Sequence, residues 1–132
     1  MKKILSLIAF VVVAVTLNFV MADSIPTVKP LEVQKMQQEK NAIIVDVREL
    51  DEQSSGMAKD AISLPLSTMK DKKEEWEKIV ATFPKDKTVV IYCKSGRRAG
   101  IVGEELVKKG FKVLNMESFD SWQNAGLPIL KK

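Results

Sequence analysis

Short runs of β-branched residues alternate along the chain with segments of helical spacing, and this alternation constrains the fold more than any other feature. The two strongest runs, 42–47 and 88–92, are rich in β-branched residues and almost entirely apolar, as expected for parallel strands buried on both faces. The expected strands are 42–47, 62–64, 88–92 and 112–116, and the expected helices are 31–39, 72–82 and 98–109. This order predicts an α/β fold with a small parallel sheet flanked by helices on both faces.

The amino-terminal segment has the pattern of an export signal. Lys2 and Lys3 precede an almost continuously apolar run, and small residues follow up to Ala22, which predicts cleavage before Asp23. An uncleaved membrane anchor is the alternative, because the run is at the short limit for spanning a bilayer. We therefore expect a periplasmic or otherwise exported domain, or one anchored to a membrane and facing outward. The expected organisation is a signal peptide at 1–22, a loose tether at 23–29 and one domain at 30–132, which suits a chain of 132 residues.

Histidine is absent from the chain, and cysteine occurs once, at Cys93. Without histidine there is no Ser-His-Asp or Cys-His catalytic pair and no imidazole-ligated metal. A single cysteine excludes an intramolecular disulfide, a Cys-x-x-Cys redox pair and a cysteine-rich zinc site. Any thiol chemistry must therefore be completed by an outside partner.

Charge is nearly balanced, with 21 Lys and Arg against 17 Asp and Glu. The net charge of +4 includes Lys2 and Lys3, so the chain without its leader has an excess of only two positive charges. That excess is too small for the broad basic surface of a nucleic-acid-binding protein, and we expect no nucleic-acid partner. Cations cluster by sign only at Lys94, Arg97 and Arg98, which predicts a local anion site.

Residues 93–98 connect an expected strand directly to an expected helix. Unpaired backbone N–H groups at a helix N-terminus form a cradle for an anion, and Gly96 allows the turn to tighten. A thiolate on Cys93 at the mouth of this cradle, with cations nearby, would be stabilised as a nucleophile. Ser95 has two open roles, as a donor to a bound oxyanion or as the helix cap. The alternative for Cys93 is an inert buried thiol, which the surrounding cations and glycine make the less favoured interpretation.

Three segments in order resemble the signatures of rhodanese-type sulfurtransferases. The segment Tyr92-Cys93-Lys94-Ser95-Gly96-Arg97-Arg98-Ala99 resembles the family's active-site loop, with Arg98 at its arginine position. The amino-terminal signature is matched by Asp46-Val47-Arg48-Glu49 with Glu52, Gly56, Ala61 and Leu64-Pro65-Leu66, and the carboxyl-terminal one by Trp122 with Gly126-Leu127-Pro128. The exported single domain is similar to the periplasmic rhodaneses of the phage-shock type.

The resemblance implies that Cys93 takes a sulfane sulfur from a donor such as thiosulfate. The sulfur would be held as a persulfide and passed to cyanide or to a thiol, protein thiols included. Residues Lys94, Ser95, Gly96, Arg97 and Arg98 would bind the substrate. We expect no cofactor and no metal, because the sequence has no dinucleotide, phosphate-loop or metal-ligand motif.

Two further pairs of residues are assigned supporting roles. Asp46 and Arg48 lie where a strand ends, and we expect an ion pair or hydrogen bonds that hold the neighbouring loop. Trp76 and Trp122 fall within helical patterns and are expected to pack in the core.

The chain departs from the family pattern in two places. Gly56-Met57-Ala58 replaces the usual Gly-His-Ile, and Glu117-Ser118-Phe119 replaces a glycine pair. We expect the second change to reshape a loop beside the site and to affect substrate choice.

Two other functions remain open at this point. Cysteine phosphatases and arsenate reductases have similar loops, but they place arginine six residues after the cysteine, where this chain has Ala99. A non-catalytic module that carries persulfide sulfur, or binds an anion or a partner protein, would retain the same residues.

Overall fold

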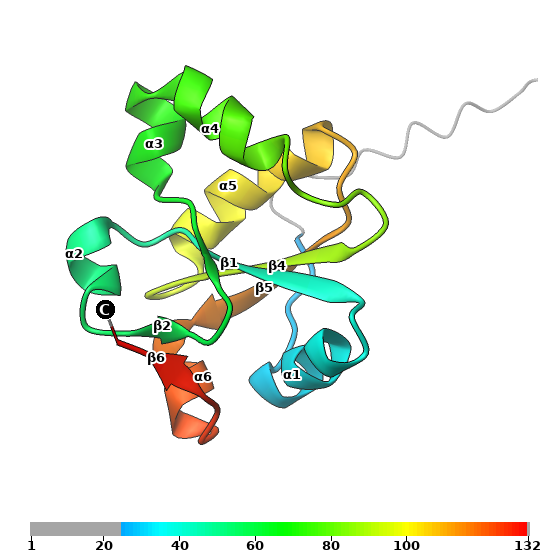
Figure 1. The fold of residues 1–132 in the computed structure, drawn as a ribbon, viewed down its shortest axis with the longest axis vertical. Helices are drawn as coiled ribbons and strands as arrows, with labels where there is room; N and C mark the ends of the chain where they lie inside the picture. Colours follow the sequence, from blue (N-terminus) through cyan, green and yellow to red (C-terminus); the bar gives the residue numbers. More distant parts are fainter. Residues whose placement is uncertain (1–24, 132) are drawn as a thin grey trace, which may run out of the picture.

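Four parallel strands form the central sheet of the structure, a computed structural model that describes residues 25–131 (Figure 1). The order across the sheet is β3-β1-β4-β5, so β1 and β4 lie in the centre. These strands are β1 (Ala42–Asp46), β3 (Ile62–Ser63), β4 (Thr88–Cys93) and β5 (Val113–Ser118). A separate antiparallel pair is formed by β2 (Met57–Ala58) and β6 (Ile129–Leu130).

Helices cover both faces of the sheet, as the alternating pattern predicts. One face carries α3 (Leu66–Asp71), α4 (Lys73–Val80) and α5 (Arg97–Lys108), and the other carries α1 (Pro30–Gln38) and α6 (Phe119–Asn124) (Figure 1). The short helix α2 (Leu50–Gln53) follows β1 at the carboxyl end of the sheet, at the left of Figure 1. The loop from β4 into α5 lies at the same end, where parallel sheets place their ligand sites.

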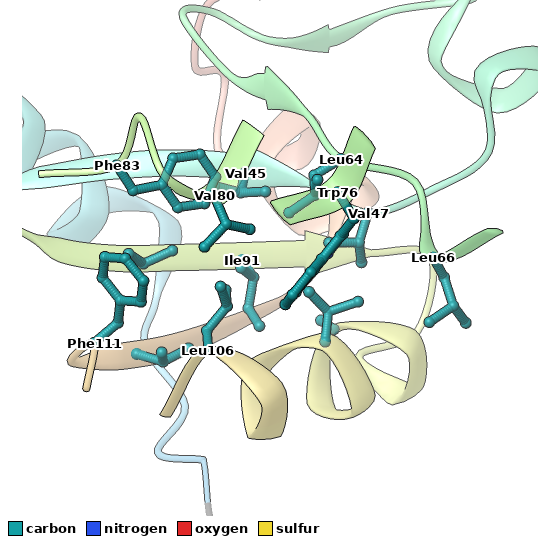
Figure 2. Close-up of a cluster of buried hydrophobic side chains, with 14 of the residues drawn as sticks. Val45, Val47, Leu64, Leu66, Trp76, Val80, Phe83, Ile91, Leu106 and Phe111 are labelled. Atoms are coloured by element: carbon teal, nitrogen blue, oxygen red, sulfur yellow. The ribbon is translucent and has the colours of Figure 1, made fainter. Parts of the chain in front are cut away.

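Successive side chains of the central strands point into two separate cores. The first cluster contains Val45, Val47, Leu64, Leu66, Trp76, Val80, Phe83, Val89, Ile91, Cys93, Ala99, Val102, Leu106, Phe111 and Val113. The second cluster contains Val33, Ala42, Ile44, Ala58, Val90, Tyr92, Met116, Phe119, Trp122 and Leu127. Figure 2 shows Ile91 of β4 pointing from the sheet towards Leu106 of α5. Both tryptophans are buried packing residues, which confirms the expectation for them.

The described part of the expected tether is bonded to the sheet, so the prediction of a loose segment is wrong for residues 25–29. The N–H of Asn115 donates to the carbonyl of Pro26 at 2.8 Å, and the N–H of Val28 donates to the carbonyl of Asn115 at 3.0 Å. Ile25 packs against the first cluster. The reason is that β5 is an edge strand whose outer backbone groups are available, and the backbone of residues 26–28 pairs with them.

The expected signal peptide at 1–22 lies outside the described residues. Among the helices within residues 25–131, none has the length and apolar character needed to cross a membrane.

The helix expected at 72–82 is observed as α4, and Lys72, at φ −134° and ψ 57°, separates it from α3.

Candidate active site

Cys93 is the last residue of β4, and its side chain is fully buried on the α5 side of the sheet. The 93–98 loop then turns directly into α5, which begins at Arg97. The backbone N–H of Gly96 donates to the Sγ of Cys93 at 3.0 Å. The sulfur therefore lies at the N-terminal end of a 12-residue helix and accepts one amide hydrogen bond, in a position where backbone N–H groups favour negative charge.

Gly96 is required by the shape of this turn. Its φ is +98°, in the left-handed region, and an added Cβ would lie 3.3 Å from the Cβ of Glu117. Gly96 is also the N-cap of α5, so the capping role left open for Ser95 is excluded. Ser95, Lys94 and Arg97 have exposed side chains at the rim of the loop.

Arg98 points to α2, where it forms a bidentate ion pair with Glu52. Its Nη1 lies 2.5 Å from Oε1 of Glu52, and its Nη2 lies 2.9 Å from Oε2. The hydrogen bond from Arg98 is the main cause that lowers the pKa of Glu52 to about 2, and the same bond raises the pKa of Arg98. The Arg98 side chain thus ties α2 to the start of α5, and the exposed cations of the loop are Lys94 and Arg97.

A buried polar network supports the loop that follows β1. Arg48 donates through Nη2 to Oδ2 of Asp46 at 2.7 Å and to the carbonyl of Gly56 at 2.7 Å. The hydroxyl of Tyr92 donates to the same Asp46 oxygen at 2.6 Å and accepts from the N–H of Ala58 at 3.0 Å. Burial is the main cause that raises the pKa of Tyr92, and the charge of Asp46 adds to it. The structure shows the ion pair expected between Asp46 and Arg48, and it braces the 49–58 segment.

A pocket of about 400 Å³ opens beside the 93–98 loop. Its walls come from α2, the 93–98 loop and α6, so three segments distant in sequence meet there. It is lined by Arg48, Glu52, Ser55, Lys94, Phe119, Asp120 and Gln123. The guanidinium carbon of Arg48 lies 4.3 Å from the centre of the Phe119 ring. The pocket presents polar groups and an aromatic ring next to Lys94 of the 93–98 loop.

No metal site was found among the described residues. Within residues 25–131, no group of three or more His, Cys, Asp or Glu side chains is arranged to hold a metal ion.

Sequence reasoning gave no role in the site to three residues that the structure places there. Glu52 was recognised as a motif residue only, and its pairing with Arg98 spans 46 positions, which no local pattern reveals. Phe119 lines the pocket, whereas the sequence marks it only as part of Glu117-Ser118-Phe119, the segment that replaces a glycine pair of the family. Asn115 carried no signal beyond its place in a weak strand, yet its side chain bonds to the 93–98 loop.

Known proteins resemble this chain in both sequence and fold. Residues 29–125 match the rhodanese-like domain family. A sulfurtransferase of Allochromatium vinosum is 33% identical over 99 residues, which is 74% of this chain and 86% of that protein. A putative sulfurtransferase of Bacillus subtilis is 30% identical over 96 residues, which is 72% of this chain and 86% of that protein. The crystal structure of a rhodanese-like domain protein from Staphylococcus aureus has a TM-score of 0.62 and 28% identity, covering 80% of this chain and 98% of its own.

The chain belongs to the rhodanese-like domain family. The predicted α/β fold is confirmed by the structure and by its likeness to the Staphylococcus aureus domain. The relatives that carry the name sulfurtransferase support sulfur transfer, in general terms, as the class of its activity.

Proposed function

We propose that this domain moves a sulfane sulfur from thiosulfate to a thiophilic acceptor through a persulfide on Cys93. In the first half-reaction the Cys93 thiolate attacks the outer sulfur of thiosulfate. The S–S bond of the donor breaks, sulfite leaves with the electron pair, and Cys93 carries a persulfide anion. In the second half-reaction cyanide attacks the outer sulfur, thiocyanate leaves, and the thiolate is regenerated.

The observation that carries this proposal is the 3.0 Å hydrogen bond from the Gly96 N–H to the Cys93 sulfur at the N-terminus of α5. Backbone N–H groups and the helix dipole favour negative charge, whether it resides on the thiolate or on the outer persulfide sulfur. Lys94 and Arg97 are exposed beside it, so an anionic donor meets positive charge as it approaches.

The single cysteine fits transfer to an external acceptor. A persulfide on Cys93 has no second thiol in the chain to resolve it, so a thiol or cyanide from outside must remove the sulfur.

The structure also weighs against phosphoryl chemistry. Ala99 occupies the position of the phosphatase arginine and is fully buried in the first cluster, so no cation reaches a tetrahedral anion from there.

Steady-state turnover of thiosulfate with cyanide tests this proposal against a module that only carries sulfur. We expect thiocyanate formation with ping-pong kinetics, and none from Cys93→Ser, because a hydroxyl cannot hold a sulfane sulfur. Thiocyanate production by the Cys93→Ser protein would overturn the proposal. Absence of turnover in the wild type would move the carrier interpretation to the front.

A pair of lysine variants tests how the donor is recognised. Lys94→Ala should raise the half-saturating thiosulfate concentration by roughly threefold to tenfold, because a nearby positive charge is lost. Lys112→Ala is the matched control, since Lys112 is an exposed lysine that lies just before β5, at the amino end of the sheet. An equal effect of the two variants would mean that Lys94 has no specific part in donor binding.

We also propose that residues 1–22 direct export of the domain and are then removed. The sequence pattern supports this proposal. Expression of the full chain should yield an exported protein whose mass corresponds to a start at Asp23. A protein of full-length mass retained in the membrane would favour the anchor instead.

A further inference from the structure

Asn115 is a buried polar residue at which three parts of the molecule meet. It is 8% exposed and lies in β5, opposite Ile91 of β4. Its backbone N–H and carbonyl pair with Pro26 and Val28. Its side chain turns instead towards the 93–98 loop, so backbone and side chain serve different partners.

The side-chain oxygen of Asn115 stabilises an irregularity in β5. The register between β4 and β5 shifts here, because Ile91 pairs with Asn115 whereas Tyr92 pairs with Glu117. One extra residue of β5 is thus accommodated next to the site. The N–H of Glu117 donates to Oδ1 of Asn115 at 2.8 Å, so the amide oxygen supplies its acceptor.

The side-chain nitrogen of Asn115 holds the loop itself. Nδ2 donates to the carbonyl of Gly96 at 3.0 Å, and the same carbonyl accepts from the N–H of Gly100 at 3.0 Å in the first turn of α5. The Gly96–Arg97 peptide is therefore held from two sides. These two bonds assign the oxygen and nitrogen of the Asn115 amide. Only one orientation of the amide lets it both accept from the Glu117 N–H and donate to the Gly96 carbonyl.

Holding this peptide matters because Gly96 is the residue whose N–H reaches the sulfur of Cys93. Glycine at φ +98° has the widest choice of backbone conformations, so the loop needs an external restraint to keep one of them. The hydrogen bond from Asn115 supplies that restraint from the neighbouring strand.

We propose that Asn115 is a positioning residue that holds the Gly96–Arg97 peptide so that the amide cradle faces the Cys93 sulfur during sulfur loading. This inference rests on the proposed function. Asn115 acts through the loop and does not touch the reacting sulfur. The bonds of Asn115 to Pro26 and Val28 are made by its backbone and do not depend on the side chain. Aspartate also keeps the oxygen that accepts from the Glu117 N–H, so Asn115→Asp isolates the loss of the bond to the loop.

Asn115→Asp and Asn115→Ser test the proposal. The aspartate still accepts from the Glu117 N–H, but it places a second acceptor against the Gly96 carbonyl, and the serine is too short to reach it. We expect the maximal rate of persulfide formation from thiosulfate to fall by about tenfold in both variants, because a buried bond that orients the site is lost. The half-saturating thiosulfate concentration should change much less, because Lys94 and Arg97 are intact.

Two readouts separate positioning from a general loss of structure. In ¹⁵N-labelled protein the amide signals of Gly96 and Arg97 should shift in the variants, while those of α4 stay in place. Alkylation of Cys93 by iodoacetamide at neutral pH should also slow, and this readout does not require that thiosulfate be a donor. If wild-type protein forms no persulfide, the proposed function fails, while alkylation and the amide signals still decide the role of Asn115.

Asn124→Asp is the matched control, because it makes the same change at an exposed position at the end of α6. It should leave loading, alkylation and the Gly96 signal as in the wild type. The Asn115→Ser variant decides the matter if Asn115→Asp does not fold. A folded Asn115→Ser protein with wild-type loading rate and an unshifted Gly96 signal would overturn the proposal, and so would equal effects at Asn124.

Discussion

Tyr92 shows how one side chain joins the core to the site. Its ring lies in the second cluster, and its hydroxyl bonds to Asp46 and to the N–H of Ala58 in β2. The strand that ends in Cys93 is thereby fixed to the segment that carries α2. A buried hydroxyl with both an acceptor and a donor contributes more than an exposed one, since neither partner can turn to water instead.

Removal of this hydroxyl should be costly. We expect Tyr92→Phe to lower the free energy of unfolding by about 1–3 kcal/mol, because it leaves the Ala58 N–H without its acceptor and removes one of the donors to Oδ2 of Asp46. Urea unfolding measures the change. Ser54→Ala, which removes an exposed hydroxyl bonded to the carbonyl of Asp51, is the control and should cost less than about 0.5 kcal/mol. Equal losses in the two variants would contradict the account.

Local sequence predicts contacts between near neighbours and misses contacts between distant ones. The pairing of Asp46 with Arg48 was predictable, because the two residues are only two positions apart at a strand end. The bonds from Tyr92 to Asp46 and from Arg98 to Glu52 each span 46 positions. They depend on which strands become neighbours, and no periodicity contains that information.

At the scale of elements, α5 packs unusually close to the sheet because of Gly103. A Cβ at this position would lie 2.8 Å from Cδ1 of Ile91, 3.3 Å from Ile25 and 3.4 Å from Val113. Helix propensity alone predicts that alanine would be better than glycine here. The close approach of helix and strand reverses that expectation, since Ile91 is fully buried and cannot move freely.

Two glycines of α5 give a matched test of this contact. Gly103→Ala should destabilise the domain by about 1–3 kcal/mol through overpacking. Gly100→Ala, in the same helix, meets nothing within 4 Å and should stabilise it by about 0.5–1 kcal/mol. Thermal unfolding of both variants checks the prediction. A stabilised Gly103→Ala protein would show that the helix is not held at this distance.

The elements themselves were predicted to different degrees. The strands β1 and β4 and the helices α1, α4 and α5 fall within a few residues of the expected ranges, because their apolar spacing is strong. The short elements α2, α3, β2 and β6 were not expected as separate units. They have two to six residues and are stabilised by tertiary contacts, such as the bond from Ala58 to Tyr92. The pairing of residues 26–28 with β5 was missed for the same reason.

At the scale of the whole molecule, the pair of Glu52 and Arg98 connects the two halves of the site. It joins α2, which follows β1, to α5, which follows β4. Both side chains are largely covered, with 28% of Glu52 and 22% of Arg98 exposed. The stability of the folded domain therefore depends on pH, because the Glu52 carboxylate must be ionised to accept both bonds.

The pKa of Glu52 sets the direction of this pH dependence. The pKa of Glu52 falls from 4.5 to about 2 on folding, so its contribution to stability is fully present above 4.5 and is lost as the pH falls towards 2. Glu52→Gln should be less stable than wild type at neutral pH, and the difference should shrink between about pH 5 and about pH 2. Oε1 of Glu52 also accepts from the backbone N–H of Glu49, the N-cap of α2, at 3.2 Å, and a glutamine oxygen can keep this bond. Urea unfolding that gives a pH-independent difference would contradict the assignment.

The measurement that tests the central claim most directly is the intact mass of the purified domain after thiosulfate and then after cyanide. The account predicts a gain of about 32 Da with thiosulfate, its removal by cyanide, and no gain in Cys93→Ser. A wild-type protein whose Cys93 stays free and reduced, with no added mass after thiosulfate, would contradict it.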